Sequence, residues 1–165
     1  MKIVVFLHGT IIMHINGINK SRYERVKQVI NKDPSISSFS DYVPIGKAHE
    51  KLFTWINQGV KIYYLSSHFR LKDVQKDKSV LKQHNFPKGE IFYRTNNIGY
   101  GAIIEKILPD ILIEDDCESI GGKKEWVITD VNQETKIKIK SIIVKEFGGI
   151  DHLPNNLLEL YNYGN

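Results

Sequence analysis

Short apolar runs divide this sequence, and polar residues follow each of them at once. The first run, residues 3–7 (IVVFL), contains no polar side chain, which is typical of a strand buried on both faces of a parallel sheet. Between the runs, apolar residues recur at helical spacing. Alternating strands and helices need crossover connections, which are right-handed and cover both faces of the sheet with helices. The sequence therefore predicts a three-layer α/β sandwich with a central parallel, Rossmann-like sheet.

Strands and helices are expected to alternate along the whole chain. The expected strands cover residues 3–7, 60–65, 91–93, 110–113 and 141–144, the last of them central, and the expected helices cover 21–30, 47–57, 71–84, 100–108 and 154–160. Ser21 and Glu24 have the spacing of a capping box at the start of the first helix. Residues 136–140 (KIKIK) alternate strictly, which favours a half-exposed strand over a short helix. Residues 13–45 are expected to form a small cap, inserted in a single domain of residues 1–165.

The composition is that of one globular domain with a substantial core. The 165 residues are 41% hydrophobic and 25% charged, a size and balance that exclude a disordered chain. The apolar runs are far shorter than the roughly 20 residues of a membrane span, and no signal peptide is visible, so we expect no membrane association. The single cysteine, Cys117, favours a reducing, cytoplasmic location. The net charge of +4 is too small and too scattered to predict binding to nucleic acid.

Polar side chains gather at the ends of the predicted strands, and this is the main sign of function. In open α/β sheets, ligands bind beyond the carboxyl ends of the strands, so residues distant in the sequence meet there. The residues in this position are His8, Gly9 and Thr10 after the first strand, Ser66, Ser67 and His68 after the second, Arg94 after the third, and Asp115 and Asp116 after the fourth.

The adjacent acids Asp115 and Asp116 are the sharpest of these features. Neighbouring carboxylates repel each other without a cation, and Mg²⁺ is commonly held by one or two carboxylates together with water and phosphate oxygens. The alternative is a simple turn at the end of a strand, closed by the aspartate side chains.

The serines and histidines also allow two interpretations each. Ser66 and Ser67 either donate hydrogen bonds to a phosphate or cap the helix that begins near residue 71. His8 and His68 either act as acid or base near neutral pH, or form a mixed histidine and carboxylate site for a transition metal. Cys117 lies beside the acids, which disfavour its thiolate, so we do not expect it to be a nucleophile.

Three segments, in this order, resemble motifs of the haloacid dehalogenase-like (HAD) superfamily of phosphohydrolases. Residues 4–10 (VVFLHGT) resemble the first motif, an apolar strand followed by Asp-x-Asp-Gly-Thr. Residues 62–66 (IYYLS) resemble the second motif, and residues 111–116 (ILIEDD) resemble the fourth. Residues 114–122 (EDDCESIGG) and 146–154 (EFGGIDHLP) are similar to segments of an uncharacterised bacterial subgroup. The resemblance implies a HAD-type sheet and a pocket for phosphate and Mg²⁺.

The chain departs from this family at both acids of the first motif. Phe6 stands where the resemblance places the aspartyl nucleophile, and His8 stands where it places the acid/base aspartate. Phenylalanine has no lone pair with which to attack phosphorus, and loss of a covalent nucleophile commonly costs about 10⁴–10⁶ in rate. The family's lysine is represented by Lys106 or replaced by Arg94.

The expected function is therefore binding of a small phosphorylated molecule without phosphoaspartyl chemistry. Mg²⁺ would be held by Asp115 and Asp116, and the phosphate by Gly9, Thr10, Ser66, Ser67 and Arg94. The alternative is a metal-dependent phosphohydrolase that uses His8 or His68 as acid or base. A purely structural domain is a third interpretation.

Overall fold

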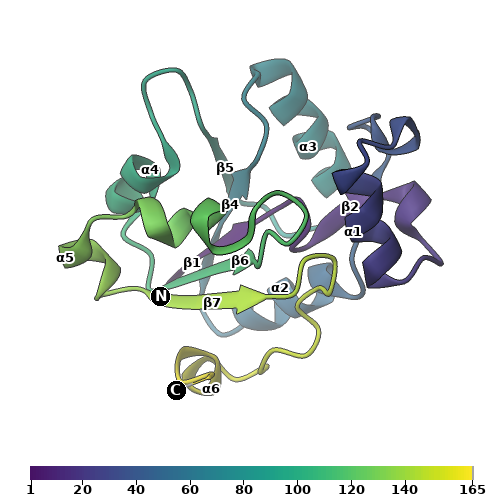
Figure 1. Ribbon diagram of the computed structural model, residues 1–165. Helices are drawn as coiled ribbons and strands as arrows, with labels where there is room; N and C mark the ends of the chain where they lie inside the picture. Colours follow the sequence, from purple (N-terminus) through teal and green to yellow (C-terminus); the bar gives the residue numbers. More distant parts are fainter. Residues whose placement is uncertain (165) are drawn as a thin grey trace.

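A five-stranded sheet forms the centre of the computed structural model, which describes residues 1–164 (Figure 1). The strands lie in the order β5-β4-β1-β6-β7, and each neighbouring pair is parallel. Their bounds are β1 (Lys2–Phe6), β4 (Lys61–Ser66), β5 (Glu90–Tyr93), β6 (Ile111–Asp115) and β7 (Lys140–Val144). The prediction of an α/β fold around a central parallel sheet is confirmed.

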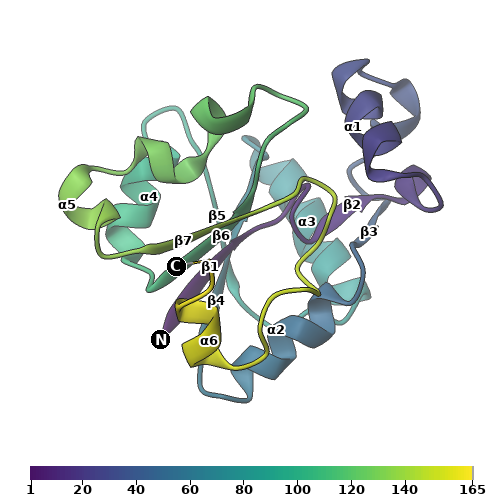
Figure 2. The ribbon, with the colours of Figure 1, turned by 60° about the horizontal axis from the view of Figure 1, so that its bottom comes forward.

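Helices cover both faces of this sheet, as Figures 1 and 2 show from two directions. One face carries α2 (Ala48–Ile56), α3 (Leu71–Gln83) and α6 (Leu157–Tyr161), and the other carries α4 (Tyr100–Ile107) and the 3₁₀ turn η4 (Val127–Asp130). A second 3₁₀ turn, η3 (Gly122–Glu125), precedes η4, and the short helix α5 (Gln133–Lys136) precedes β7. Among residues 1–164, no helix has the length and apolar character needed to cross a membrane.

Alternate side chains of the strands enter two separate cores. Val5 of β1 lies in register with Tyr64 of β4 and Ile113 of β6, and all three are buried under α2 and α3. The next residue back, Val4, points to the other face with Leu112 and is buried under α4. Both faces of the central strands are thus covered, which explains why these segments are continuous apolar runs.

The insertion, residues 13–45, leaves the sheet after β1 and returns before α2. It contains η1 (Ile15–Gly17), α1 (Arg22–Ile30) and η2 (Pro34–Ile36), between two short strands, β2 (Ile12–His14) and β3 (Tyr42–Pro44), that pair antiparallel. The predicted capping box is present, since the side chains of Ser21 and Glu24 each accept from the other's backbone N–H. Figure 1 shows α1 and β2 on the side toward which the arrow of β7 points, at the carboxyl ends of the strands.

Two predicted elements differ in the structure. Residues 136–140 do not form a half-exposed strand, because Asn132 caps α5 by accepting from the Thr135 N–H and strand β7 begins only at Lys140. Ile137 lies in the turn between them and is 73% exposed, whereas Ile139 is buried, so the two alternating apolar residues do not share one buried face. The strand expected at 141–144 is present, but it lies at the edge of the sheet beside β6 rather than at its centre.

Candidate functional site

A cavity of about 360 Å³ opens at the carboxyl ends of the strands. One wall is made by residues that follow the sheet strands, and the other by residues of the insertion, including His14, Arg25 and Tyr42. The predicted site residues that line the cavity are His8, Gly9, Ser67, Arg94 and Asp115. Thr10, Ser66, His68 and Asp116 are not part of the lining, and their side chains contact groups around it.

An acidic cluster, defined as Asp115, Asp116 and Glu146, lies on one side of the cavity. One carboxylate oxygen from each residue lies within 4.8 Å of the others. Asp115 and Glu146 are buried and Asp116 is partly buried. Asp115 ends β6, whereas Glu146 follows the neighbouring strand β7, so the parallel pairing of these strands brings the carboxylates together.

Hydrogen bonds fix the orientation of each carboxylate in the acidic cluster. Thr10 Oγ1 donates to Asp115 Oδ2 (2.8 Å), and the Cys117 N–H donates to Asp115 Oδ1 (3.0 Å). Ser119 donates to Glu146 from its backbone N–H (2.7 Å) and from its hydroxyl (2.6 Å). The Asp115–Cys117 contact is the strand-end turn expected from the sequence, and it is present together with the clustering of the acids.

Asp116 has its own partners in the cluster. It accepts from the Glu146 N–H (3.0 Å) and pairs with Lys145 Nζ (3.0 Å). These contacts connect the end of β6 to the end of β7 and hold the cluster together.

Burial and mutual repulsion disfavour negative charge on two of these acids. Burial raises the pKa of Asp115, and the charge of Asp116 raises it further, despite the hydrogen bonds it accepts. Burial likewise raises the pKa of Glu146, with added repulsion from Asp115 and Asp116. Burial also opposes ionisation of Asp116, but the Glu146 N–H and Lys145 outweigh it and lower the pKa of Asp116. The cluster is therefore a place where a bound cation would relieve charge repulsion.

Glu114 precedes the cluster and faces the opposite side of the strand. Its carboxylate accepts from the Val127 N–H (2.6 Å) and the Ile128 N–H (3.1 Å) at the start of η4. Burial is the largest influence and raises the pKa of Glu114 to about 7, against the effect of these two hydrogen bonds. Cys117 is half-buried near the same acids, and burial together with Asp115 and Glu114 raises the pKa of its thiol, as expected for a residue that is not a nucleophile.

Gly9 allows the backbone after β1 to approach the acidic cluster. Its φ is +81°, and a Cβ atom at this position would lie 3.0 Å from Asp115 Oδ2 and 3.3 Å from Glu146 Cγ. Its carbonyl accepts from the Phe147 N–H (2.6 Å). A residue with a side chain would therefore be strained here and would also press on the carboxylates.

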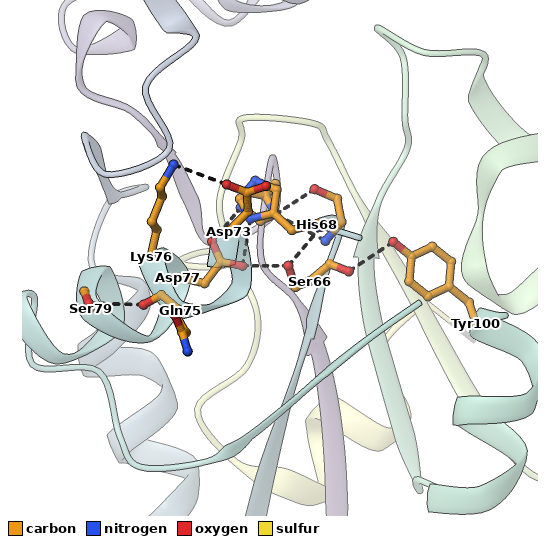
Figure 3. A network of polar contacts seen from close by, with 10 residues as sticks. Ser66, His68, Asp73, Gln75, Lys76, Asp77, Ser79 and Tyr100 are labelled. Atoms are coloured by element: carbon orange, nitrogen blue, oxygen red, sulfur yellow. Dashed lines mark hydrogen bonds and ion pairs between the residues drawn. The ribbon is translucent and has the colours of Figure 1, made fainter. Parts of the chain in front are cut away.

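On the other side of the cavity, His8, Ser66, Ser67, His68 and Asp77 form what we call the histidine network. Figure 3 shows Ser66, His68 and Asp77 of this network, with the hydrogen bond from Ser66 to Asp77 as a dashed line. His8 Nε2 lies 3.1 Å from Asp77 Oδ1, and His68 Nδ1 lies 3.1 Å from Asp77 Oδ2. Ser66 Oγ donates to Asp77 Oδ2 (2.6 Å) and accepts from the His68 N–H (3.0 Å). Ser67 Oγ lies 2.9 Å from His8 Nδ1.

The charge of Asp77 determines which nitrogens of the two rings carry hydrogen. Burial alone would raise the pKa of Asp77, but hydrogen bonds from His68, His8 and Ser66 lower it well below its ordinary value. An ionised carboxylate only accepts, so His8 Nε2 and His68 Nδ1 are the donors. In neutral His8, Nδ1 then carries the free lone pair and accepts from the Ser67 hydroxyl.

Aromatic rings of the insertion contact both histidines. The Phe39 ring centre lies 4.2 Å from that of His68, and the Tyr42 ring centre lies 5.2 Å from that of His8, nearly perpendicular to it. The two histidine rings lie 4.4 Å apart, centre to centre. The insertion is therefore in direct contact with the histidine network.

The structure also decides between alternatives for the remaining residues. Helix α3 begins after Arg70 without a side-chain cap, so neither Ser66 nor Ser67 has the capping role. Arg94 follows β5 and stacks over the Tyr100 ring, 4.4 Å from its centre. Lys106 lies exposed in the last turn of α4, before β6 begins, and is not part of the cavity lining.

The sequence prediction missed two acids that complete the site. Asp77 is fully buried in α3, in the apolar stripe formed by Val74 and Leu81 at helical spacing. A charged residue in that stripe was the signal that could have identified it. Glu146 gives no comparable signal, because only the pairing of β6 with β7 brings it to Asp115 and Asp116.

Two solved structures of a Class C acid phosphatase from Bacillus anthracis resemble this fold. The one with tungstate bound has a TM-score of 0.55 and 17% sequence identity, covering 90% of this chain and 68% of the phosphatase. The second has a TM-score of 0.56 and 18% identity, covering 90% and 67%. No protein-family model and no curated protein matches the sequence. At this level of identity the likeness concerns the fold. The chain therefore shares the fold of these phosphatases.

Proposed function

We propose that the chain binds a small phosphorylated molecule in this cavity, together with Mg²⁺ at the acidic cluster. The observation that carries the proposal is the convergence of Asp115, Asp116 and Glu146 beside the turn at Gly9, where Asp115 and Gly9 line a cavity large enough for a small ligand. The Class C acid phosphatase with tungstate bound has a similar fold, and its name is consistent with a phosphate-related ligand here.

The donor set of the acidic cluster fits Mg²⁺. This ion prefers hard oxygen ligands and is usually held by a few carboxylates together with water and phosphate oxygens. The cluster offers three carboxylates, and burial together with mutual repulsion raises the pKa values of Asp115 and Glu146, so negative charge on them is disfavoured without a cation. Mg²⁺ bound there would compensate that charge and attract the phosphate group of the ligand.

Positive and polar groups of the cavity provide the contacts for the phosphate. Arg94 and Lys124 line the cavity and carry positive charge, and Ser67 also lines it. Thr10 orients Asp115, and Ser66 orients Asp77, so these two residues act on the phosphate through their carboxylate partners. We assign to the insertion the role of a cap, because it supplies the second wall of the cavity.

Phe6 stands where the resemblance places the aspartyl nucleophile, so this proposal includes no such nucleophile. The Phe6 ring lies half-buried, 5.8 Å from the Tyr100 ring centre in an edge-to-face arrangement, and lines the cavity. An aromatic side chain can enclose a ligand there, but it cannot attack phosphorus.

Calorimetric titration with MgCl₂, and with inorganic phosphate in the presence of MgCl₂, tests the proposal. We expect Mg²⁺ to bind, phosphate to bind only with Mg²⁺, and both affinities to fall at least about tenfold in Asp115→Asn, since ligand loss removes a charge-assisted contact. Asp41→Asn is the matched control, because Asp41 is exposed and lies outside the cavity. Equal binding by native protein and Asp115→Asn would remove the acidic cluster from the function.

Hydrolysis of the bound phosphoester is a second candidate function, favoured by one observation. The His8 ring is held by Asp77 at Nε2, and Nδ1, which accepts from the Ser67 hydroxyl, carries a lone pair that can take up a proton. A panel of phosphomonoesters with Mg²⁺, Mn²⁺ or chelator tests it. Turnover that is lost in both His8→Ala and Asp115→Asn supports hydrolysis, and turnover that persists in both indicates a contaminant.

A further inference from the structure

Ser67, His8 and Asp77 have the arrangement of a base-activated serine. The Ser67 hydroxyl lies 2.9 Å from His8 Nδ1, and His8 Nε2 lies 3.1 Å from Asp77 Oδ1. A hydroxyl, an imidazole and a buried carboxylate in this order activate nucleophiles in unrelated folds, and they are identified by geometry and not by sequence position. From this geometry, we propose that Ser67 is a nucleophile toward the phosphorus of a phosphate ester in the cavity.

Exposure distinguishes the two adjacent serines. Ser67 is partly exposed and lines the cavity, whereas Ser66 is fully buried and its hydroxyl donates to Asp77. A bound ester can therefore reach Ser67 Oγ and cannot reach Ser66 Oγ. Ser66 is a positioning residue, since it holds the carboxylate that holds His8.

His8 and Asp77 also differ in burial. The His8 side chain is 12% exposed and also lines the cavity, whereas the Asp77 side chain is 1% exposed and lies behind the ring. Asp77 fixes the hydrogen on Nε2, so the lone pair of Nδ1 points at the Ser67 hydroxyl. The ring also accepts a longer contact from the Ser67 N–H (3.4 Å), which keeps residue 67 beside it.

The proposed reaction with a phosphomonoester balances with water as the only co-reactant. Ser67 Oγ bonds to phosphorus, the bond from phosphorus to the alcohol oxygen breaks, and the hydroxyl proton passes to His8 Nδ1 and then to the leaving alcohol. Water next attacks the phosphoserine and gives a proton to His8, and the Oγ–P bond breaks as Ser67 regains that proton. The products are an alcohol and inorganic phosphate.

This inference rests on the proposed function for its substrate, but it can be tested without Mg²⁺ or phosphate. The probe is an alkyl fluorophosphonate, in which Ser67 Oγ replaces fluoride at phosphorus, fluoride leaves, and the hydroxyl proton passes to His8. The whole chain is incubated with the probe in chelator, and the modified residue is identified by peptide mass spectrometry.

We expect one adduct, on Ser67, that is absent in Ser67→Ala. Loss of the general base in His8→Gln is expected to slow labelling by about a hundredfold. Ser79→Ala is the matched control, because Ser79 is exposed on α3 and donates only to the Gln75 carbonyl, so labelling should be unchanged. An unlabelled Ser67 in folded native protein overturns the proposal, and so does labelling that needs a metal ion or proceeds equally fast in His8→Gln.

Two further variants, Ser67→Cys and Ser79→Cys, test the proposal if His8→Gln does not fold. In Ser67→Cys the thiol would face His8 Nδ1, whereas in Ser79→Cys it would face only the helix backbone and solvent. We expect iodoacetamide to modify Cys at position 67 at least about tenfold faster, because a nearby base favours the thiolate. Equal rates overturn the proposal. Failure of Mg²⁺ and phosphate binding with intact serine labelling would instead remove only the proposed ligand class.

Discussion

His8 Nε2 and Asp77 Oδ1 lie 3.1 Å apart, although 69 positions separate the two residues in the sequence. His8 belongs to the turn after β1, and Asp77 belongs to the buried face of α3. The contact therefore joins the end of β1 to α3, the helix that follows β4. It holds one side of the wall formed at the strand ends, and the acidic cluster lies at the other side of that wall.

Asp77→Asn is expected to destabilise the protein by about 2–3 kcal/mol near neutral pH. The ionised carboxylate accepts from two histidines and Ser66, and hydrogen bonds to a buried charge contribute roughly 1.5–3 kcal/mol each. Urea unfolding of native protein, Asp77→Asn and the exposed control Asp41→Asn measures the difference. A loss no larger in Asp77→Asn than in Asp41→Asn would contradict the assignment of a charged Asp77.

Because the pKa of Asp77 is lowered in the folded protein, we expect the protein to lose stability in acid. The pKa of folded Asp77 lies below the ordinary value of 3.8. The unfolded chain therefore binds this proton first, and the stabilisation is present above about pH 4 and is lost as the pH falls through the folded value. Thermal unfolding between about pH 2 and pH 5 should show a weaker dependence on pH in Asp77→Asn than in native protein.

For Glu114 we expect the opposite effect of pH on stability, and at higher pH. Its pKa is raised from 4.5 to about 7 by burial, so the folded protein holds a proton that the unfolded chain has released. Stability should therefore decrease between about pH 4.5 and pH 7, by up to about 3 kcal/mol. Urea unfolding across this range should show a flatter profile in Glu114→Gln. The exposed Glu134→Gln should keep the native profile, and an equally steep profile in Glu114→Gln would show that another group is responsible.

Mg²⁺ binding should release protons in mildly acidic solution. Burial and mutual repulsion raise the pKa values of Asp115 and Glu146 in the protein without a cation, so each holds its proton to a higher pH than an ordinary carboxyl group, and a bound cation would displace that proton. Calorimetry at about pH 5 in two buffers with different ionisation enthalpies counts the released protons. We expect the number to fall as the pH is raised, and to be smaller in Glu146→Gln. Release that does not change with pH would be inconsistent with this explanation.

Gly9→Ala should lower both stability and Mg²⁺ affinity, whereas Gly59→Ala should lower only stability. Both glycines have positive φ, +81° and +87°, but a Cβ at Gly9 would lie 3.0 Å from Asp115 Oδ2 and a Cβ at Gly59 meets nothing within 4 Å. The conformational cost is roughly 1 kcal/mol for Gly59→Ala and about 1–3 kcal/mol for Gly9→Ala. Urea unfolding of the two variants measures the cost of backbone strain, and Mg²⁺ titration measures the effect of steric contact with the acidic cluster.

The strands and their polar ends could be predicted from the sequence because both depend on local patterns. Residues 3–7 and 111–113 are apolar runs, and parallel strands place their carboxyl ends at the same edge, so His8 and Asp115 were expected near one cavity. The strand predicted at 136–140 was wrong because the cap at Asn132 decided the local structure, and apolar alternation gave no information about it.

The partners of the site residues could not be predicted in the same way. Which of Ser66 and Ser67 faces the cavity depends on the direction of the backbone after β4, which the sequence Ser-Ser does not encode. The pairing of Glu146 with Asp115 depends on β7 lying beside β6 at the edge of the sheet, a matter of tertiary packing. Residue types were thus predictable, and their mutual contacts were not.

The insertion is joined to the rest of the domain partly by ionic and polar contacts that water can reach. Arg22 pairs with Glu118 beyond β6, with both side chains more than a third exposed, and Arg25 donates to the Phe147 carbonyl (3.1 Å). Dissolved salt screens exposed ion pairs of this kind. The ionic strength of the surrounding solution thereby becomes a control on how tightly one wall of the cavity is held, acting at a distance from the groups that contact a ligand.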